Sequence, residues 1–273
     1  MEYLLLAERL RVEERRLIEA FDALGCTARL LTPAQIGSIQ FGDANGANDV
    51  SPRPATSTII SRLHPTREAS ALLWALESVG WKVVPGAAQM DVFARRDRLY
   101  RELSRAGVPV VETVLGWGTN AVLSAVDRVH FPVELLPLDG GEPEIIVEDR
   151  EGAEAVVEHR AVLGREHVLL VRRGAAQSEQ RRLLIAGGEV FATLLSGEAD
   201  WTVVPVTPAD REIAGKVSTA VGASLIDMSY LPCSGNAVTT VLPLLSFRSV
   251  QSETSDVAAA IARCVGRTEA VHG

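Results

Sequence analysis

The stretch FPVELLPLDGG (Phe131–Gly141) joins a mainly apolar run to a proline and two glycines. A short apolar run that ends at turn residues is typical of a buried β-strand. The segment PEIIVED (Pro143–Asp149) is expected to pair with this strand across the DGGE turn. A strand followed by a glycine turn can bring its backbone close to a phosphate, but such a site also needs a cation. The position expected to carry that cation holds Leu136.

On both sides of this stretch, expected strands alternate with expected helices. EYLLLA (Glu2–Ala7) and TARLLT (Thr27–Thr32) are expected strands, and the helical pattern VEERRLIEAFDALG (Val12–Gly25) lies between them. A strand–helix–strand order indicates a parallel sheet in an α/β domain. Further along, DVFARRDRLYRELSRAG (Asp91–Gly107) is expected to form one basic helix. RRLLIAGGEVFATLLSG is expected to form a hairpin that turns at Gly187–Gly188.

These elements predict an α/β fold whose C-terminal part is α+β, divided into three units. Residues 1–89 are expected to form an N-terminal α/β domain, residues 90–175 a small central domain, and residues 176–273 a larger domain built on a sheet.

Composition limits the classes of function. The 273 residues are 47% hydrophobic with a net charge of −8, which suits a globular protein and disfavours a nucleic-acid partner. No apolar run has the length of a membrane helix and no secretion signal opens the chain, so no membrane association and a cytoplasmic location are expected. The three cysteines, Cys26, Cys233 and Cys264, form no disulfide or zinc pattern, and the five histidines show no metal spacing. Of the 27 basic residues only Lys82 and Lys216 are lysines.

Several stretches together resemble the ATP-grasp ligases, which phosphorylate a carboxylate with ATP and then join it to an amine. The resemblance is nearest to the ligases that add an amino acid to a carrier protein in lysine and arginine biosynthesis, followed by those that add glutamate to a ribosomal protein. It follows nearly the whole chain in order. It rests on RLRVEERRLIEAFDALG, SRLHPTREASALLWALESVGWKVVPG, RELSRAGVPVVET, FPVELLPLDGG, RRLLIAGGEVFATLLSGEADW and VGASLIDMSY.

The resemblance implies a nucleotide site with ATP and Mg²⁺ as cofactors. The family uses two lysines at this site. The first falls near ARRDRL, where an arginine such as Arg96 could take its place. The second falls at Leu136, which could instead be a plain core residue. The hinge that grips adenine falls at Val171–Arg173, although two adjacent arginines also suit a solvated strand end. The residues implied at the cofactor site are therefore Arg96, Gly140, Gly141, Val171, Arg172 and Arg173.

The resemblance also places a metal ligand and a catalytic arginine. Asp227 aligns with the first magnesium ligand, or alternatively is a hydrogen-bonding aspartate. The other two ligands of the family fall at Thr240 and Leu242, which offer no carboxylate. Arg182 matches the arginine expected to act on phosphate.

The sequence matches the family's substrate-binding segment better than its nucleotide-binding motifs. Ser61, Arg62 and Arg67 match the segment that faces the amino-acid or carrier substrate, although surface arginines near a helix start are the alternative. Two hypotheses for function follow. The first is a degenerate, non-catalytic homologue that forms a homo-oligomer or joins an active ligase, with a small acidic carrier protein as a further possible partner. The second is an ATP-dependent carboxylate–amine ligase that works with arginines and a reduced metal site.

Overall fold

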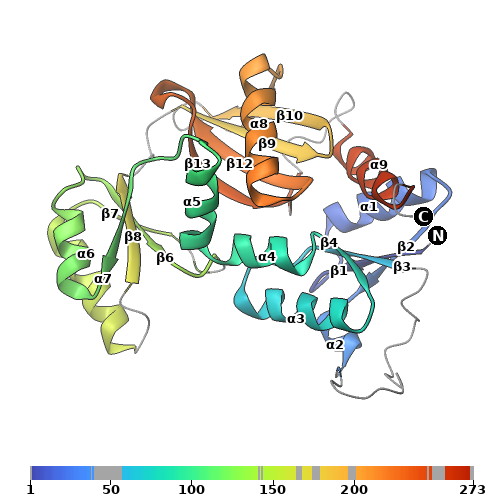
Figure 1. Ribbon diagram of the computed structural model, residues 1–273, viewed down its shortest axis with the longest axis horizontal. Coiled ribbons are helices and arrows are strands. Elements are labelled where there is room, and N and C mark those ends of the chain that lie inside the picture. The colour runs from blue at the N-terminus through green and yellow to red at the C-terminus, as the bar shows by residue number, and fades with distance from the viewer. Residues whose placement is uncertain are drawn as a thin grey trace.

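A computed structural model gives the structure of the chain (Figure 1) and describes residues 2–37, 39, 57–140, 142, 144–163, 168–173, 179–195, 201–244, 246–247 and 256–270. These residues form three β-sheets with helices on their faces. The mixture of parallel and antiparallel sheets confirms the predicted α/β class with an α+β C-terminal part.

The N-terminal sheet is parallel, with the strand order β2-β1-β3-β4. Its strands are β1 (Glu2–Leu6), β2 (Thr27–Leu31), β3 (Ser57–Ser61) and β4 (Lys82–Val84). Because successive side chains of a strand point to opposite faces, the apolar run of β1 serves two cores. Leu4 and Leu6 pack with helix α3 (Arg67–Ser78), whereas Tyr3 and Leu5 pack with α1 (Val12–Ala23) and α9 (Val257–Ala270). Helix α2 (Pro33–Ile36) follows β2.

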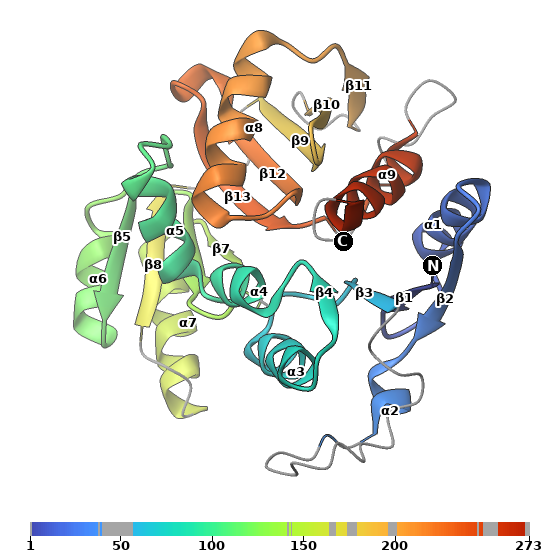
Figure 2. The ribbon, with the colours of Figure 1, turned by 45° about the vertical axis from the view of Figure 1, so that its right-hand side comes forward.

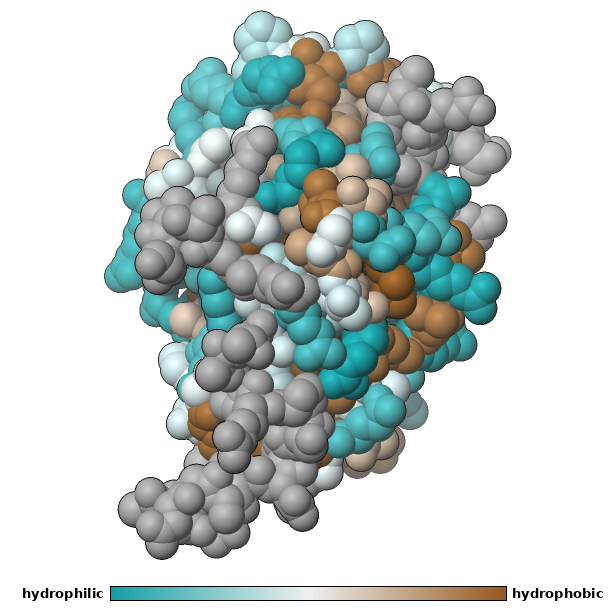
Figure 3. All heavy atoms as spheres, turned by 90° about the vertical axis from the view of Figure 1, so that its right-hand side faces the viewer, coloured by the Kyte–Doolittle hydropathy of each residue, from teal (hydrophilic) through white to brown (hydrophobic). Residues whose placement is uncertain are grey.

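The side of the molecule that carries α1 and α9 is shown in Figure 3, where hydrophilic and apolar side chains are interspersed. Val12 and Leu24, at the two ends of α1, are about half exposed. Among the described residues, no helix has the length and apolar character needed to cross a lipid bilayer.

The central sheet is antiparallel and has the order β5-β8-β6-β7. Its strands are β5 (Thr113–Trp117), β6 (Val133–Pro137), β7 (Ile145–Val147) and β8 (Val168–Arg173). Helices α6 (Thr119–Val126) and α7 (Arg150–Val162) cover one face and form a core of their own with it. The predicted pairing of PEIIVED with the strand before it is confirmed, since Val133 pairs with Val147.

The C-terminal sheet is antiparallel in the order β11-β10-β9-β12-β13. Its strands are β9 (Gln180–Ala186), β10 (Glu189–Leu195), β11 (Thr202–Val204), β12 (Leu225–Leu231) and β13 (Ala237–Pro243). The predicted hairpin is confirmed, and Gly187 has the positive φ of 63° that its turn requires. Helix α8 (Pro208–Val221) packs on one face together with α5 (Arg96–Arg105). A short 3₁₀ turn, η2 (Pro232–Ser234), links β12 to β13.

The prediction of one basic helix over 91–107 is wrong. The chain forms α4 (Ala87–Ala94) and α5, separated at Arg95, whose φ of −125° and ψ of 99° are extended. Arg95 also forms an isolated β-bridge with Asp139 of the β6–β7 turn, so a long-range contact interrupts the helical pattern. The three sheets fall within the predicted ranges 1–89, 90–175 and 176–273. Helix α9 nevertheless packs on α1, and the exact domain boundaries stay predictions.

The capped start of α8 leads to a pH prediction. Asp210 is fully buried and accepts hydrogen bonds from Arg181 (2.7 Å), Tyr230 (2.6 Å) and the Thr207 backbone N–H (2.6 Å). Burial alone would raise the pKa of Asp210, but these hydrogen bonds outweigh it and hold the pKa below its usual value. The stability given by ionised Asp210 is therefore fully present above about pH 4, the value for an unfolded aspartate, and is lost as the pH falls through the lowered pKa.

We expect Asp210→Asn to lower the free energy of unfolding by about 2 kcal/mol at pH 7. The difference from the wild type should shrink as the pH falls below about 4. Urea denaturation at several pH values measures this difference. Glu212→Gln is the control, since Glu212 pairs with Lys216 on the exposed side of the same helix, and it should leave the urea midpoint unchanged. A difference that stayed constant into strong acid would contradict the assignment.

Candidate functional site

A cleft of about 360 Å³ lies between α5, the β6–β7 turn and β13. It adjoins the place where the central sheet meets the C-terminal sheet (Figure 2). Apolar side chains such as Leu99 and Val241 form much of its wall. Its polar lining residues are Arg96, Tyr100, Glu142, Glu144, Thr239 and Thr240. Both lining carboxylates are paired with arginines, Glu142 with Arg160 (2.9 Å) and Glu144 with Arg172 (3.6 Å).

The predicted catalytic arginine and the predicted metal ligand bind each other. Arg182 on β9 donates from Nε to Oδ1 of Asp227 on β12 (2.8 Å) and from Nη2 to Oδ2 (2.6 Å). Nη2 also donates to the Ser246 carbonyl (3.0 Å). Burial raises the pKa of the Asp227 carboxyl, and the two hydrogen bonds from Arg182 oppose that rise. Because both carboxylate oxygens accept from a guanidinium, Asp227 is held as an ion-pair partner.

The neighbouring strand offers no other carboxylate at this point. In the register of β12 with β13, Asp227 lies opposite Leu242 and Ser229 lies opposite Thr240. Within the described ranges, no three or more His, Cys, Asp or Glu side chains are grouped so that they could hold a metal ion.

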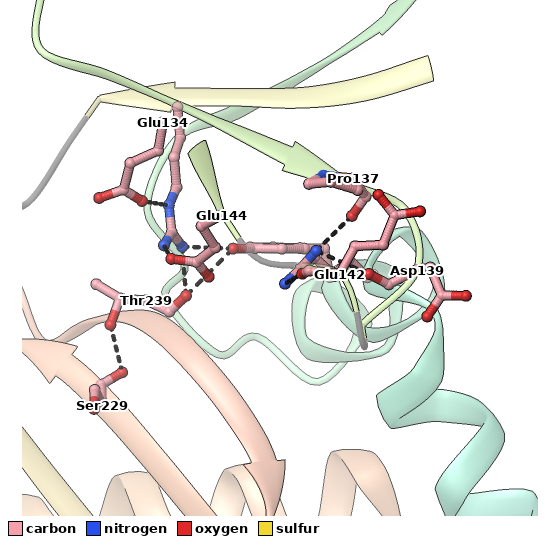
Figure 4. A network of polar contacts seen from close by, with 10 residues as sticks. Glu134, Pro137, Asp139, Glu142, Glu144, Ser229 and Thr239 are labelled. Carbon is pink, nitrogen blue, oxygen red and sulfur yellow. Dashed lines mark hydrogen bonds and ion pairs between the residues drawn. The ribbon is translucent and has the colours of Figure 1, made fainter. Parts of the chain in front are cut away.

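Arg96 is bound to the turn that was expected to cover phosphates. Its guanidinium donates to three backbone carbonyls of that turn, those of Pro137 (2.7 Å), Asp139 (2.9 Å) and Glu142 (2.8 Å). Burial lowers the pKa of Arg96, although nearby carboxylates oppose the shift. Arg96 therefore holds the turn in place through these hydrogen bonds. Figure 4 shows Pro137, Asp139 and Glu142 of this turn close together.

Gly140 has a packing role in the same turn. Its N–H donates to the Ala94 carbonyl (2.8 Å), and a Cβ at this position would lie 2.4 Å from the carbonyl oxygen of Phe93. The glycine thus permits contact with the end of α4. Gly141 lies outside the described residues.

The expected hinge strand β8 has three different environments. Val171 faces the core under α6 and α7. Arg172 is only 3% exposed, so the alternative of a solvated strand end is wrong for this residue. It donates from Nε to Oε2 of Glu134 (2.5 Å) and from Nη1 to the Tyr100 hydroxyl (2.7 Å). Arg173 pairs with Val133 through the backbone, and its side chain lies outside the described residues.

Leu136 is a buried strand residue. It is 1% exposed and lies in register with Leu170 on β8. Its neighbours Val133 and Leu135 face the core under α6 and α7, so Leu136 points to the opposite face of the central sheet. A leucine there provides no charge for a phosphate.

The predicted substrate residues do not share one surface. Arg62 is buried: its Nε donates to Glu14 of α1 (3.2 Å), its Nη1 donates to the Leu244 carbonyl, and its guanidinium lies 5.6 Å from the centre of the Phe247 ring. The alternative of a surface arginine is therefore wrong for Arg62. Ser61 is also buried, and its hydroxyl makes no hydrogen bond with the described residues. Arg67 is half exposed, with its Nε 4.0 Å from Asp139.

Comparison with solved structures identifies the family. The crystal structure of a RimK domain protein ATP-grasp from Sphaerobacter thermophilus DSM 20745 matches this chain with a TM-score of 0.81 and 32% sequence identity, over 97% of this chain and 99% of that one. The chain belongs to the ATP-grasp family. No family model matches the sequence.

More distant ATP-grasp structures share the fold alone. The ATP-grasp ligase PsnB complexed with a minimal precursor is 13% identical with a TM-score of 0.73, over 97% of this chain and 98% of that one. D-alanine–D-alanine ligase from Bacillus anthracis is 11% identical with a TM-score of 0.68, over the full length of both chains. They support the predicted ATP-grasp fold, whereas the predicted nearest subgroup stays a prediction.

The residues present do not fit magnesium-ATP, the cofactor that the ATP-grasp family implies. Magnesium binds through oxygen ligands, chiefly carboxylates and phosphates, and Asp227 is already held by Arg182. Arg96, which lines the cleft, is bound to backbone carbonyls, and Arg172, which binds Tyr100 of the lining, is bound to Glu134. We therefore assign no chemical step to ATP at this site.

The sequence patterns missed three residues that shape the site: Tyr100, Glu134 and Thr239. Glu134 carried a usable signal, since a single carboxylate inside an apolar strand must find a buried partner. Tyr100 and the Thr239 carbonyl carried none, because their roles depend on contacts between distant parts of the chain.

Proposed function

We propose that this chain is a non-catalytic ATP-grasp protein that acts as a partner or regulatory subunit of an active ligase, one that joins amino acids to a carrier protein. The observation that carries the proposal is the two-bond pair between Arg182 and Asp227. This ion pair occupies both the Arg182 guanidinium, which was expected to bind phosphate, and the Asp227 carboxylate, which was expected to bind magnesium. A catalyst that stabilises a transferring phosphoryl group needs such charges to be available.

Calorimetric titration with magnesium-ATP tests the loss of the nucleotide site. We expect no heat of binding at high nucleotide concentration, with or without magnesium. PsnB is a suitable positive control, since one of its structures is a complex with Mg and ADP. Magnesium-dependent binding with micromolar affinity would overturn the proposal.

The partner role has a separate test. The chain would be mixed with an active amino-acid–carrier-protein ligase from the same organism, and complex formation would be followed by light scattering after gel filtration. A defined complex with altered ligase kcat/KM is expected. The absence of a complex, with ligase activity unchanged, would contradict the partner role without bearing on the nucleotide site.

The second candidate is an ATP-dependent carboxylate–amine ligase that acts on an amino acid or on the terminal glutamate of a carrier protein. It is favoured by the cleft of about 360 Å³, which has the size of a small-molecule site. The same titration separates the two candidates, because only the ligase requires magnesium-ATP to bind.

A further inference from the structure

The guanidinium of Arg172 joins two sheets that otherwise have separate cores. Arg172 belongs to the central sheet, and its Nη1 donates both to the Tyr100 hydroxyl on α5 and to the Thr239 carbonyl on β13 of the C-terminal sheet. Figure 4 shows Glu134 of the central sheet and Thr239 of β13 near each other, and both bind Arg172. The Arg172 side chain is 3% exposed, so water does not compete for these contacts.

Within the part of the chain that the structure describes, the apolar core of the central sheet is separate from that of the C-terminal sheet, so polar contacts help to join the two. Among the described residues, the core of the central sheet under α6 and α7 is built from residues of 114–171, whereas the core of the C-terminal sheet is built with α5 and α8. The main contacts of β5, β6, β7 and β8 are with one another and with α6 and α7. Units joined by a polar interface are expected to move relative to each other.

The Arg172 bridge is well placed to restrain that motion. Glu134 holds one side of the guanidinium (2.5 Å) and Glu144 lies 3.6 Å from Nη2, so the charge is balanced within the central sheet. Burial would lower the pKa of Arg172, but Tyr100 and Glu134 outweigh this and raise it, so the guanidinium keeps its charge. Burial raises the pKa of Tyr100, so its hydroxyl keeps its proton.

We propose that Arg172 is an internal latch that holds the central sheet against the C-terminal sheet and restrains their relative motion at the cleft beside it. The latch is made entirely by the chain itself, from Arg172, Glu134, Tyr100 and the Thr239 carbonyl. A ligand that entered between the two sheets would have to displace this bridge. The latch would restrain motion between the two sheets whether or not the cleft binds a nucleotide.

Hydrogen exchange followed by mass spectrometry tests the latch in the full chain. Arg172→Met removes the bridge, and Arg172→Met with Glu134→Gln removes it without leaving Glu134 charged and buried. In both variants we expect amides of the β6–β7 turn and of α5 to exchange about tenfold faster or more. Amides of β1 and β3 in the N-terminal sheet should exchange as in the wild type.

Arg150→Met is the matched control, since Arg150 forms an exposed pair with Asp127 inside the central unit. It should leave the exchange of the turn and of α5 unchanged. Unchanged exchange in the double variant would overturn the proposal, because other contacts would then hold the sheet. Faster exchange across all three sheets would also overturn it, because Arg172 would then be a general folding contact.

Discussion

Leu136→Lys is expected to destabilise the protein by about 4 kcal/mol at pH 7 and to create no binding of magnesium-ATP. The residue is 1% exposed on a central β-strand. A lysine forced into such a site loses hydration, and its pKa can fall by up to about 3–5 units. The ordinary lysine pKa is about 10.4, so at pH 7 most of this penalty is felt as lost stability.

The pH dependence of stability in Leu136→Lys tests whether burial of the lysine causes the loss of stability. The unfolded lysine keeps a proton that the folded one gives up, so the loss of stability should shrink as the pH rises toward about 10. Leu136→Met keeps the apolar character and about the same volume, and should cost less than about 1.5 kcal/mol. Urea denaturation of both variants measures the difference. A stable lysine variant that bound magnesium-ATP would show that the position faces an open nucleotide site.

The fold could be predicted because local patterns and the apolar periodicity agree along most of the chain. The apolar run EYLLLA formed the buried strand β1, and the pattern VEERRLIEAFDALG formed helix α1. The glycine pair Gly187–Gly188 turned the hairpin of β9 and β10. Such signals lie within a few residues of one another, so a single sequence reveals them.

The site was less predictable because its arginines are satisfied by distant partners. Arg172 binds Tyr100, 72 residues away, and Arg62 binds Glu14, 48 residues away. Spacing in the sequence does not show such pairs, which arise only when the sheets assemble. The resemblance singled out Arg62, Arg96, Arg172 and Arg182 as candidate site residues. It did not show that each would be bound by groups of the same chain.

Arg62→Met is expected to lower the free energy of unfolding by about 3–5 kcal/mol. The Arg62 and Glu14 side chains are 2% and 4% exposed, and removal of the arginine leaves a charged carboxylate in the interior. The Leu244 carbonyl also loses its donor. The large loss therefore reflects the uncompensated Glu14 more than the strength of the ion pair itself.

A double-mutant cycle with Glu14→Gln measures the coupling between the two residues. Because the double variant has no unpaired buried charge, it should be more stable than Arg62→Met alone. Arg29→Met is the matched control: its pair with Glu2 is 45% and 32% exposed, so its loss should change stability by about 1 kcal/mol or less. If Arg62 served a substrate instead, Arg62→Met would unfold like this control. A large loss confined to Arg62→Met would show that an arginine expected to meet a substrate instead joins α1 and β3 to the segment after β13.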